Sequence, residues 1–277
     1  MKTDYADGRE RYLFDSLQEV ERYISATPRK WRRNASQQND ARQGWDLRAG
    51  YEGALELARN GWNEGAARVK QAFKALPPLT PAPREKVDFY GHRPHVPRFC
   101  AGAPDNMVRH APDANLGSKS VLTLYCPINA LGDVPAQAMA NYGVAILHHV
   151  NQLELQGVSV ELYAVICSLV RRVRVCHVWK CKSAGQPLNL SSVAFSIGHP
   201  AAFRRIGFAL RERVQAPECA GYGESQRADF KDIIGAPVGA AILNGMVSAD
   251  IYARTPESAL EYVGQEIERA LEQREAA

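Results

Sequence analysis

Apolar residues recur every three or four positions in several stretches of the chain, which is the spacing of amphipathic helices. The first example is Leu17, Val20 and Ile24, which would share one face of a short helix that ends before Pro28. The same spacing predicts further helices, at residues 49–60, 63–76, 134–156, 190–198, 200–214 and 256–275. Shorter apolar runs, typical of buried strands, occupy residues 120–128, 158–167 and 238–243.

Polar residues and glycines at the ends of these stretches match helix boundaries. Asp15-Ser16 followed by Glu19 resembles a capping box, in which side chains satisfy the first backbone N–H groups of a helix. Gly61 separates the second and third helices, because glycine can take the left-handed conformation that ends a helix. Thr255-Pro256 would cap the last helix. Residues 1–76 are therefore expected to form a small helical unit.

The order of the remaining elements predicts an α/β fold. A β-α-β unit is expected from three consecutive elements, at residues 120–128, 134–156 and 158–167. Residues 171–182 follow after only a short gap, so they should pair with the preceding strand as an antiparallel hairpin. We therefore expect a Rossmann-like mixed sheet within residues 119–277. Residues 77–118 contain eight prolines and are expected to cross between the two parts without continuous regular structure.

Positive charge is concentrated in the middle of the chain, although the formal net charge is only +4. Nine lysines and arginines lie between Arg171 and Arg213, against one acid, Glu212. Alternate side chains of a strand point to opposite faces. One face of strand 171–182 would then carry a cationic row, made of Arg172, Arg174, Lys180 and Lys182. Such a row on a rigid strand suits a phosphate backbone.

Two further basic clusters extend this pattern. Residues 28–39 are polar with little to bury, so they are expected to form a mobile arm. The arm carries Arg29, Lys30, Trp31, Arg32 and Arg33, and its tryptophan could stack on a base. The predicted helix 200–214 carries Arg204, Arg205, Arg211 and Arg213. Convergence of the three clusters would indicate a binding surface for single-stranded nucleic acid, whereas dispersed clusters would only cover solvent-exposed faces and strand edges.

No motif in the sequence specifies a reaction. The chain lacks a Gly-x-Ser-x-Gly elbow, a Walker loop and a Gly-x-Gly-x-x-Gly turn after a strand. The pair His92 and His95 and the run from Cys176 to Cys181 lack the Cys-x2-Cys pairs of zinc sites. A helix-turn-helix, a zinc finger and an RNP motif are also missing, so sequence-specific reading of a duplex is not indicated. We expect a protein that is not an enzyme and binds neither a cofactor nor a metal.

Composition indicates the compartment. No run of about 18 apolar residues is available to span a bilayer, and Met1 to Asp7 lack the apolar character of a signal peptide. A cytoplasmic protein without a membrane partner is therefore expected. Of the six cysteines, Cys126 and Cys167 lie in apolar runs and no regular pairing pattern is visible, so we favour buried free thiols over a disulfide set.

Three stretches carry a resemblance to a known group of proteins: Gly61 to Gly65, Val96 to Met107 and Val193 to Arg205. They resemble largely uncharacterised bacteriophage proteins with a von Willebrand factor A-like α/β core. The resemblance implies a phage origin, an infected bacterial host and a von Willebrand A-like sheet. Such domains bind a cation with an Asp-x-Ser-x-Ser loop, but the corresponding stretch here reads Cys-Pro-Ile-Asn-Ala, residues 126–130, and offers none of those ligands.

These observations lead to two hypotheses about function. The first is a phage-encoded, non-enzymatic single-stranded DNA-binding protein that acts in replication, or that recruits a phage RNA polymerase as comparable cofactors of some podoviruses do. The second is a metal-free von Willebrand A-like adaptor or virion component. In that case the acidic helix 256–275, with six glutamates and two arginines, would dock a partner. Leu260, Val263, Ile267 and Leu271 could anchor this helix to its own domain or to a second subunit of a homo-oligomer.

Overall fold

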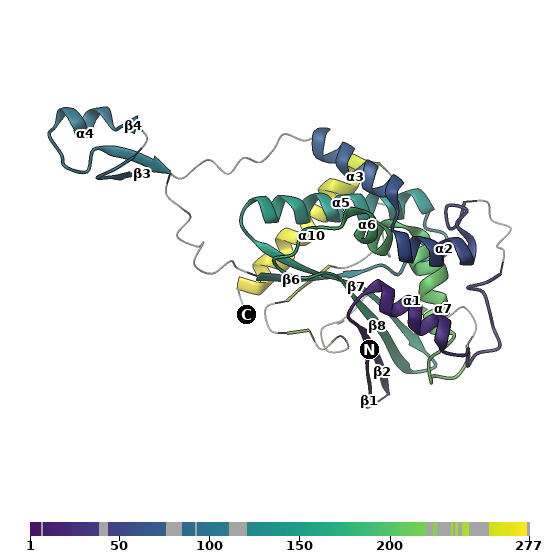
Figure 1. Ribbon diagram of the computed structural model, residues 1–277. Helices are drawn as coiled ribbons and strands as arrows, with labels where there is room; N and C mark the ends of the chain where they lie inside the picture. Colours follow the sequence, from purple (N-terminus) through teal and green to yellow (C-terminus); the bar gives the residue numbers. More distant parts are fainter. Residues whose placement is uncertain are drawn as a thin grey trace.

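In a computed structural model of the chain, a mixed β-sheet carries a layer of helices on one face (Figure 1). The strand order is β1-β2-β8-β7-β6-β10, and the short strand β9 also pairs with β7. The structure describes residues 1–6, 8–38, 44–75, 85–91, 93–110, 121–219, 224–225, 234, 236–237, 240–243 and 255–275. The fold is thus mixed α/β, as the order of elements in the sequence predicts.

Both parallel and antiparallel pairs occur in the main sheet. Its strands are β1 (Lys2–Ala6), β2 (Arg9–Phe14), β6 (Val121–Pro127), β7 (Ser159–Val170), β8 (Val173–Lys182), β9 (Glu224–Ser225) and β10 (Ala241–Ile242). β6 lies parallel to β7 and β10, and β2 lies parallel to β8. The predicted antiparallel hairpin of β7 and β8 is present, and β1 and β2 form a second antiparallel pair.

The helices pack on this sheet around one long, buried helix. They are α1 (Leu17–Ala26), α2 (Gly50–Asn60), α3 (Asn63–Ala75), α5 (Ala136–Leu155), α6 (Leu190–Gly198), the π-helix η2 (Ala202–Gly207), α7 (Phe208–Arg211) and α10 (Pro256–Glu275). α5 is buried over most of its length because α3, α6 and α10 pack against it. A Cβ atom on Gly143 would lie 2.1 Å from the Cα atom of Gly198, so the crossing of α5 and α6 requires glycine.

Several predicted boundaries are confirmed. Ser16 caps α1 by accepting a hydrogen bond from the Glu19 N–H, and the Glu19 carboxylate accepts one from the Asp15 N–H at 2.8 Å. Gly61 ends α2 with a φ of 81°. α10 spans the predicted residues 256–275. These ends are set by local side-chain chemistry, which is why the sequence alone predicts them.

The N-terminus differs from the prediction of a purely helical unit. Residues 2–6 and 9–14 form two strands, and β2 lies beside the basic strand β8. Tyr12 and Phe14 point into the core shared with the helices, whereas Arg9 is exposed. The expected helix 200–214 is present from residue 200 to Arg211, but its middle is a π-helical turn. Of the expected strand 238–243, residues 241–242 form β10, and residues 238–239 lie outside the described part.

The proline-rich stretch contains a second, small sheet. Its strands are β3 (Glu85–Asp88), β4 (Arg93–Pro94) and β5 (Met107–His110), and the helix α4 (Val96–Cys100) connects β4 to β5. β5 is the central strand and pairs antiparallel with both others. The stretch is therefore not a simple crossing segment, although its flanks at 76–84 and 111–120 lie outside the described residues.

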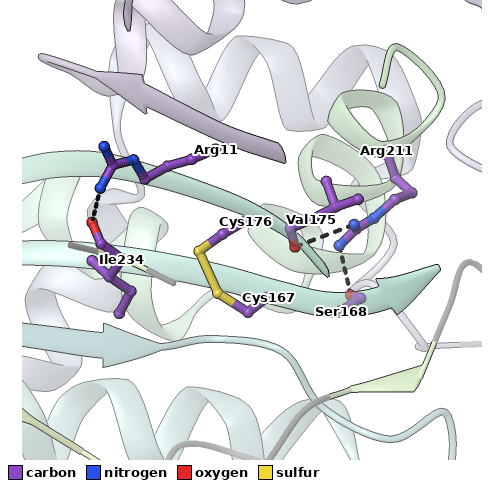
Figure 2. Close-up of a disulfide and its surroundings, with 7 residues drawn as sticks. All are labelled: Arg11, Cys167, Ser168, Val175, Cys176, Arg211 and Ile234. Atoms are coloured by element: carbon purple, nitrogen blue, oxygen red, sulfur yellow. Dashed lines mark hydrogen bonds between the residues drawn. A yellow bond between two sulfur atoms is a disulfide. The ribbon is translucent and has the colours of Figure 1, made fainter. Parts of the chain in front are cut away.

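One disulfide corrects the expectation of free thiols. Cys167 and Cys176 face each other directly across β7 and β8, with their Cα atoms 4.3 Å apart, and their sulfur atoms are bonded (Figure 2). The sequence does not show this pairing because it depends on the register of the hairpin. Cys126 is a buried free thiol as expected, and burial raises its pKa.

Loss of the disulfide is expected to lower the free energy of unfolding by roughly 2–3 kcal/mol, because the bond closes a short loop in the unfolded chain. The measurement is urea denaturation of the Cys167→Ser/Cys176→Ser variant. Cys100→Ser is the matched control, since Cys100 is an exposed free thiol. Equal stability of the double variant and the wild type would contradict a stabilising role of the bond.

Candidate nucleic-acid interface

Two arginines form the turn of the β7–β8 hairpin. β7 ends at Val170 and β8 begins at Val173, so Arg171 and Arg172 are the two turn residues. Their φ angles are 45° and 72°, in the left-handed region that favours asparagine and glycine in such turns. A residue with a Cβ atom costs roughly 1–2 kcal/mol there. Both side chains are exposed, so these arginines occupy positions where local stability would favour Asn-Gly.

Two more arginines lie beside this turn on neighbouring strands. Arg9 of β2 is the register partner of Arg174 of β8, and both are exposed. The Arg174 N–H donates a hydrogen bond of 2.9 Å to the carbonyl oxygen of Gly8, which fixes the start of β2 against the start of β8. We call Arg9, Arg171, Arg172 and Arg174 the hairpin-end cluster.

The predicted cationic row does not reach the end of β8. In the pairing of β7 with β8, Leu162 faces Lys182 and Tyr163 faces Lys180, so Cys181 is an extra residue and forms a β-bulge. The bulge turns Lys180 and Lys182 to opposite faces of the sheet. The prediction of one shared face is therefore wrong for Lys182, whereas Arg174 and Lys180 are six residues apart in regular pairing and do lie on one face.

The two lysines are also engaged within the protein. Lys182 is buried, and its Nζ contacts the Glu154 carboxylate and donates to the carbonyl oxygen of Val160 at 3.0 Å. Lys180 is half-buried, and its Nζ lies 2.9 Å from the Glu161 carboxylate. The hydrogen bond to Glu161 raises the pKa of Lys180. Neither lysine offers a free charge to a phosphate.

The segment expected to be a mobile arm is packed against the domain. Trp31 is buried, and its Nε1 donates to the carbonyl oxygen of Ala216 at 2.9 Å. The backbone N–H groups of Lys30 and Trp31 both donate to the carbonyl oxygen of Glu212. Trp31 therefore belongs to the core and cannot stack on a base, which corrects the prediction. Its basic neighbours remain exposed, namely Arg29, Lys30, Arg32 and Arg33.

This segment and the hairpin-end cluster lie at the same end of the molecule. Ala216 accepts the hydrogen bond from Trp31, and the adjacent Gln215 N–H donates to the Glu10 carboxylate at 2.9 Å. Glu10 follows Arg9 in β2. Residues 215–216 thus link the segment 29–33 to β2 on the helix-covered face of the sheet, and Arg9, next to Glu10 in the strand, points to the opposite face.

The third basic cluster is buried. The prediction of a surface role for Arg204 and Arg205 is therefore wrong. The Arg204 guanidinium donates to the carbonyl oxygens of Trp45 and Val134 and lies 4.9 Å from the Trp45 ring centre. The Arg205 Nε lies 2.6 Å from the carboxylate of Asp46. Arg205 also donates to three backbone carbonyls of the N-terminal segment, those of Ala35, Ser36 and Gln38. These arginines hold the loop before α2 in place and do not face solvent.

Arg211 and Arg213 have a similar internal role. Arg211 donates to the Ser168 hydroxyl at 2.6 Å and to the carbonyl oxygen of Val175 (Figure 2). Burial lowers the pKa of Arg211 to about 10. Arg213 donates to the carbonyl oxygens of Ile24 and Thr27, at the end of α1. The four arginines of the segment 204–213 therefore serve the fold by binding internal carbonyl, hydroxyl and carboxylate groups.

The sequence reasoning missed Arg9 and included residues that are not accessible. The pairing of β2 with β8 is what places Arg9 beside the hairpin turn. The available signal was the alternation of Arg9, Arg11 and Leu13 with buried neighbours, since Glu10, Tyr12 and Phe14 all point into the core. This six-residue strand is short and rich in charge, so the pattern is weak.

A model of a domain of unknown function, DUF7192, matches residues 5–265. The chain belongs to the DUF7192 family. No curated protein and no solved structure matches it. The matched region of this DUF7192 protein contains the hairpin-end cluster and the basic segment 29–33, so both are part of the family domain and not additions at a terminus.

The described part of the DUF7192 chain has no group of three histidine, cysteine, aspartate or glutamate side chains placed to hold a metal ion. Asn129 follows β6, and its side chain is fully buried. Among the same residues, no helix is long and apolar enough to cross a membrane.

The acidic C-terminal helix of the DUF7192 protein packs on its own domain. Ala259, Val263 and Ile267 of α10 are buried, and the helix lies against α5 and β10. Its outer face is acidic and exposes Glu257, Glu261, Glu268 and Glu272. The sequence allowed the apolar face of this helix to contact either its own domain or a second subunit. The described contacts are with its own domain.

Proposed function

We propose that this protein is a phage-encoded, non-enzymatic protein that binds single-stranded DNA through the hairpin-end cluster and the basic segment 29–33. It would act in the cytoplasm of the infected host, in replication or as a cofactor that recruits a phage RNA polymerase. The sheet would serve as a von Willebrand A-like scaffold without the metal site. Binding would be tolerant of sequence, because the contacts would be made by arginines to phosphates.

The observation that carries the proposal is the pair of left-handed arginines at the hairpin turn. Residues held in unfavourable backbone conformations cluster at functional sites, because the rest of the fold compensates for their cost. Arg171 and Arg172 are exposed, and a turn of Asn-Gly would serve the hairpin at least as well. A function that needs two cations at this point explains their presence, whereas solubility alone could be supplied from any exposed position.

The surrounding cations give the site enough charge to follow a nucleic-acid backbone. Arg9 and Arg174 extend the turn along two strands. The segment 29–33 adds four exposed cations at the same end, of which Arg33 is paired with Glu218 at 3.8 Å. With Trp31 buried, base stacking from this segment does not contribute, so phosphate contacts would dominate the affinity.

The variant Arg171→Asn/Arg172→Gly tests this proposal because it removes two charges and improves the turn. We expect weaker binding to single-stranded DNA and a smaller salt dependence, with the slope of log K against log salt reduced by about 1.4 if both arginines contact phosphates. The thermal stability of the variant should be equal to or higher than that of the wild type, since a strained turn is relieved. Fluorescence anisotropy across a salt series measures the slope.

Lys70→Ala/Lys74→Ala is the matched control. It also removes two exposed positive charges, but from α3, which packs on α5 and α6. Its affinity and slope should stay at the wild-type values. A folded Asn-Gly variant that binds with unchanged affinity and slope would refute the proposed site.

A second candidate function rests on the acidic face of α10. Four exposed glutamates on a helix whose other face is fixed to the core could dock a basic partner protein, as expected of an adaptor or virion component. Reversing Glu261 and Glu268 to lysine should then abolish partner binding and leave DNA affinity unreduced. Loss of DNA binding in the hairpin-turn variant favours the first function.

A further inference from the structure

The small sheet of residues 85–110 exposes the most prominent apolar side chains of the described chain. Phe89, Tyr90, Val96 and Phe99 are between 63% and 70% exposed. The other large exposed apolar residues of the described part are less accessible and are scattered over the main body. We call these four residues the apolar patch. A concentration of this kind on one small unit marks an interaction site.

The small sheet has almost no core of its own. α4 has no buried residue, and Val108 of β5 is the one residue of the unit that counts among the buried apolar side chains of the described chain. A hollow of about 460 Å³ lies beside Val96, and its lining is mixed, with Arg93 and His95 next to the valines. Units this small need an external source of stability, such as a partner surface.

The charges of this unit do not favour a polyanion as the partner. Residues 85–110 contain four lysines and arginines and three acids, so the net charge is close to zero. Arg98 is already committed, because its guanidinium binds both carboxylate oxygens of Asp105, at 2.6 and 2.7 Å. The patch is therefore apolar and nearly neutral, which suits an apolar protein surface better than nucleic acid.

A second copy of this chain presents a matching surface. Three aromatic side chains that each bury about 150–250 Å² when covered, with one valine, would remove roughly 500 Å² per copy from water. Two copies would together bury about 1,000 Å², which is near the lower limit for a specific interface. A two-fold axis brings the same patch of each copy together, so the contact closes without further growth.

We propose that the apolar patch is the interface of a homodimer. The outer strands β3 and β4 have neighbours on one side only within the described residues, so strand pairing across the two-fold axis could add to the contact. This inference does not depend on the proposed nucleic-acid function, because it concerns another sheet and other residues.

The test is the solution mass of the full chain by sedimentation over a wide concentration range. The wild type, with a chain mass of 30.6 kDa, should approach twice that mass, and the dimer should persist at high salt because apolar contacts are not screened. Phe89→Ser/Phe99→Ser should stay monomeric throughout, with its circular dichroism spectrum and the melting temperature of the main body unchanged. Leu131→Ser/Leu155→Ser alters exposed apolar residues elsewhere and should still dimerise.

A wild type that remains monomeric at every concentration would overturn the proposal. A dimer that survives in the Phe89→Ser/Phe99→Ser variant would also overturn it, because the interface would then lie elsewhere. The wild type and the Phe89→Ser/Phe99→Ser variant should also be assayed for single-stranded DNA binding, so that failure of this inference can be told from failure of the proposed function. If the wild type is monomeric and the Phe89→Ser/Phe99→Ser variant binds DNA less tightly than the wild type, the patch binds nucleic acid instead.

Discussion

Replacing Trp31 by alanine is expected to lower the free energy of unfolding by about 3–5 kcal/mol. The side chain is buried, and its Nε1 donates to the carbonyl oxygen of Ala216, so the variant loses packing and a hydrogen bond together. Urea denaturation measures the effect. Binding of the folded variant to single-stranded DNA should change little, because the ring does not reach solvent.

Lys30→Ala and Arg32→Ala are the controls for this prediction. They flank Trp31 and are exposed, so each should change stability by less than about 0.5 kcal/mol. Their effect should instead be seen in the salt dependence of DNA binding. If Trp31→Ala were as stable as the wild type and bound DNA poorly, the tryptophan would be a surface residue after all.

Replacing Arg205 by methionine is expected to destabilise the protein by about 3–5 kcal/mol, because it leaves a buried carboxylate without its partner. The Arg205 Nε lies 2.6 Å from Asp46, and both side chains are at least nine-tenths buried. Three carbonyl oxygens of residues 35, 36 and 38 lose a donor at the same time. Thermal or urea denaturation gives the difference.

A double variant separates the ion pair from the rest of the effect. Arg205→Met/Asp46→Leu removes both charges and should be less destabilised than the sum of the single variants. Arg33→Met is the surface comparison, because Arg33 and Glu218 are both more than one-third exposed, and its cost should stay below about 1 kcal/mol. If Arg205→Met lowered the free energy of unfolding no more than Arg33→Met does, the structural role of the buried pair would be contradicted.

The fold was predictable where local patterns decide it. The β7–β8 hairpin, the long helix α5 and the C-terminal helix α10 follow from apolar periodicity and, for α10, from the end signal Thr255-Pro256. Strands β1 and β2 were not predictable in the same way. β1 pairs with β2, and β2 is stabilised by β8, more than 160 residues away, a partner about which sequence periodicity carries no information.

The candidate site was predictable only in part, because a charged residue in a sequence gives no sign of whether it is buried. Arg172 and Arg174 are exposed as expected. Lys182 is turned inward by the extra residue Cys181, and the register of a hairpin with a bulge cannot be deduced from alternation alone. Arg204 and Arg205 lie in a segment of high charge, yet they supply internal donors for backbone carbonyls that would otherwise lack them.

The hydrogen bonds that fix the N-terminal segment impose an order on folding during synthesis. Arg205, Glu212 and Arg213 bind Asp46, Ser36 and Ile24, across sequence separations of 159 to 189 positions. These residues are made long before residues 205–213, so they cannot dock until that later part of the chain has been synthesised. During that interval Tyr12 and Phe14 of the early strand β2 stay uncovered, so the nascent chain passes through a period in which mispairing or chaperone capture competes with correct folding.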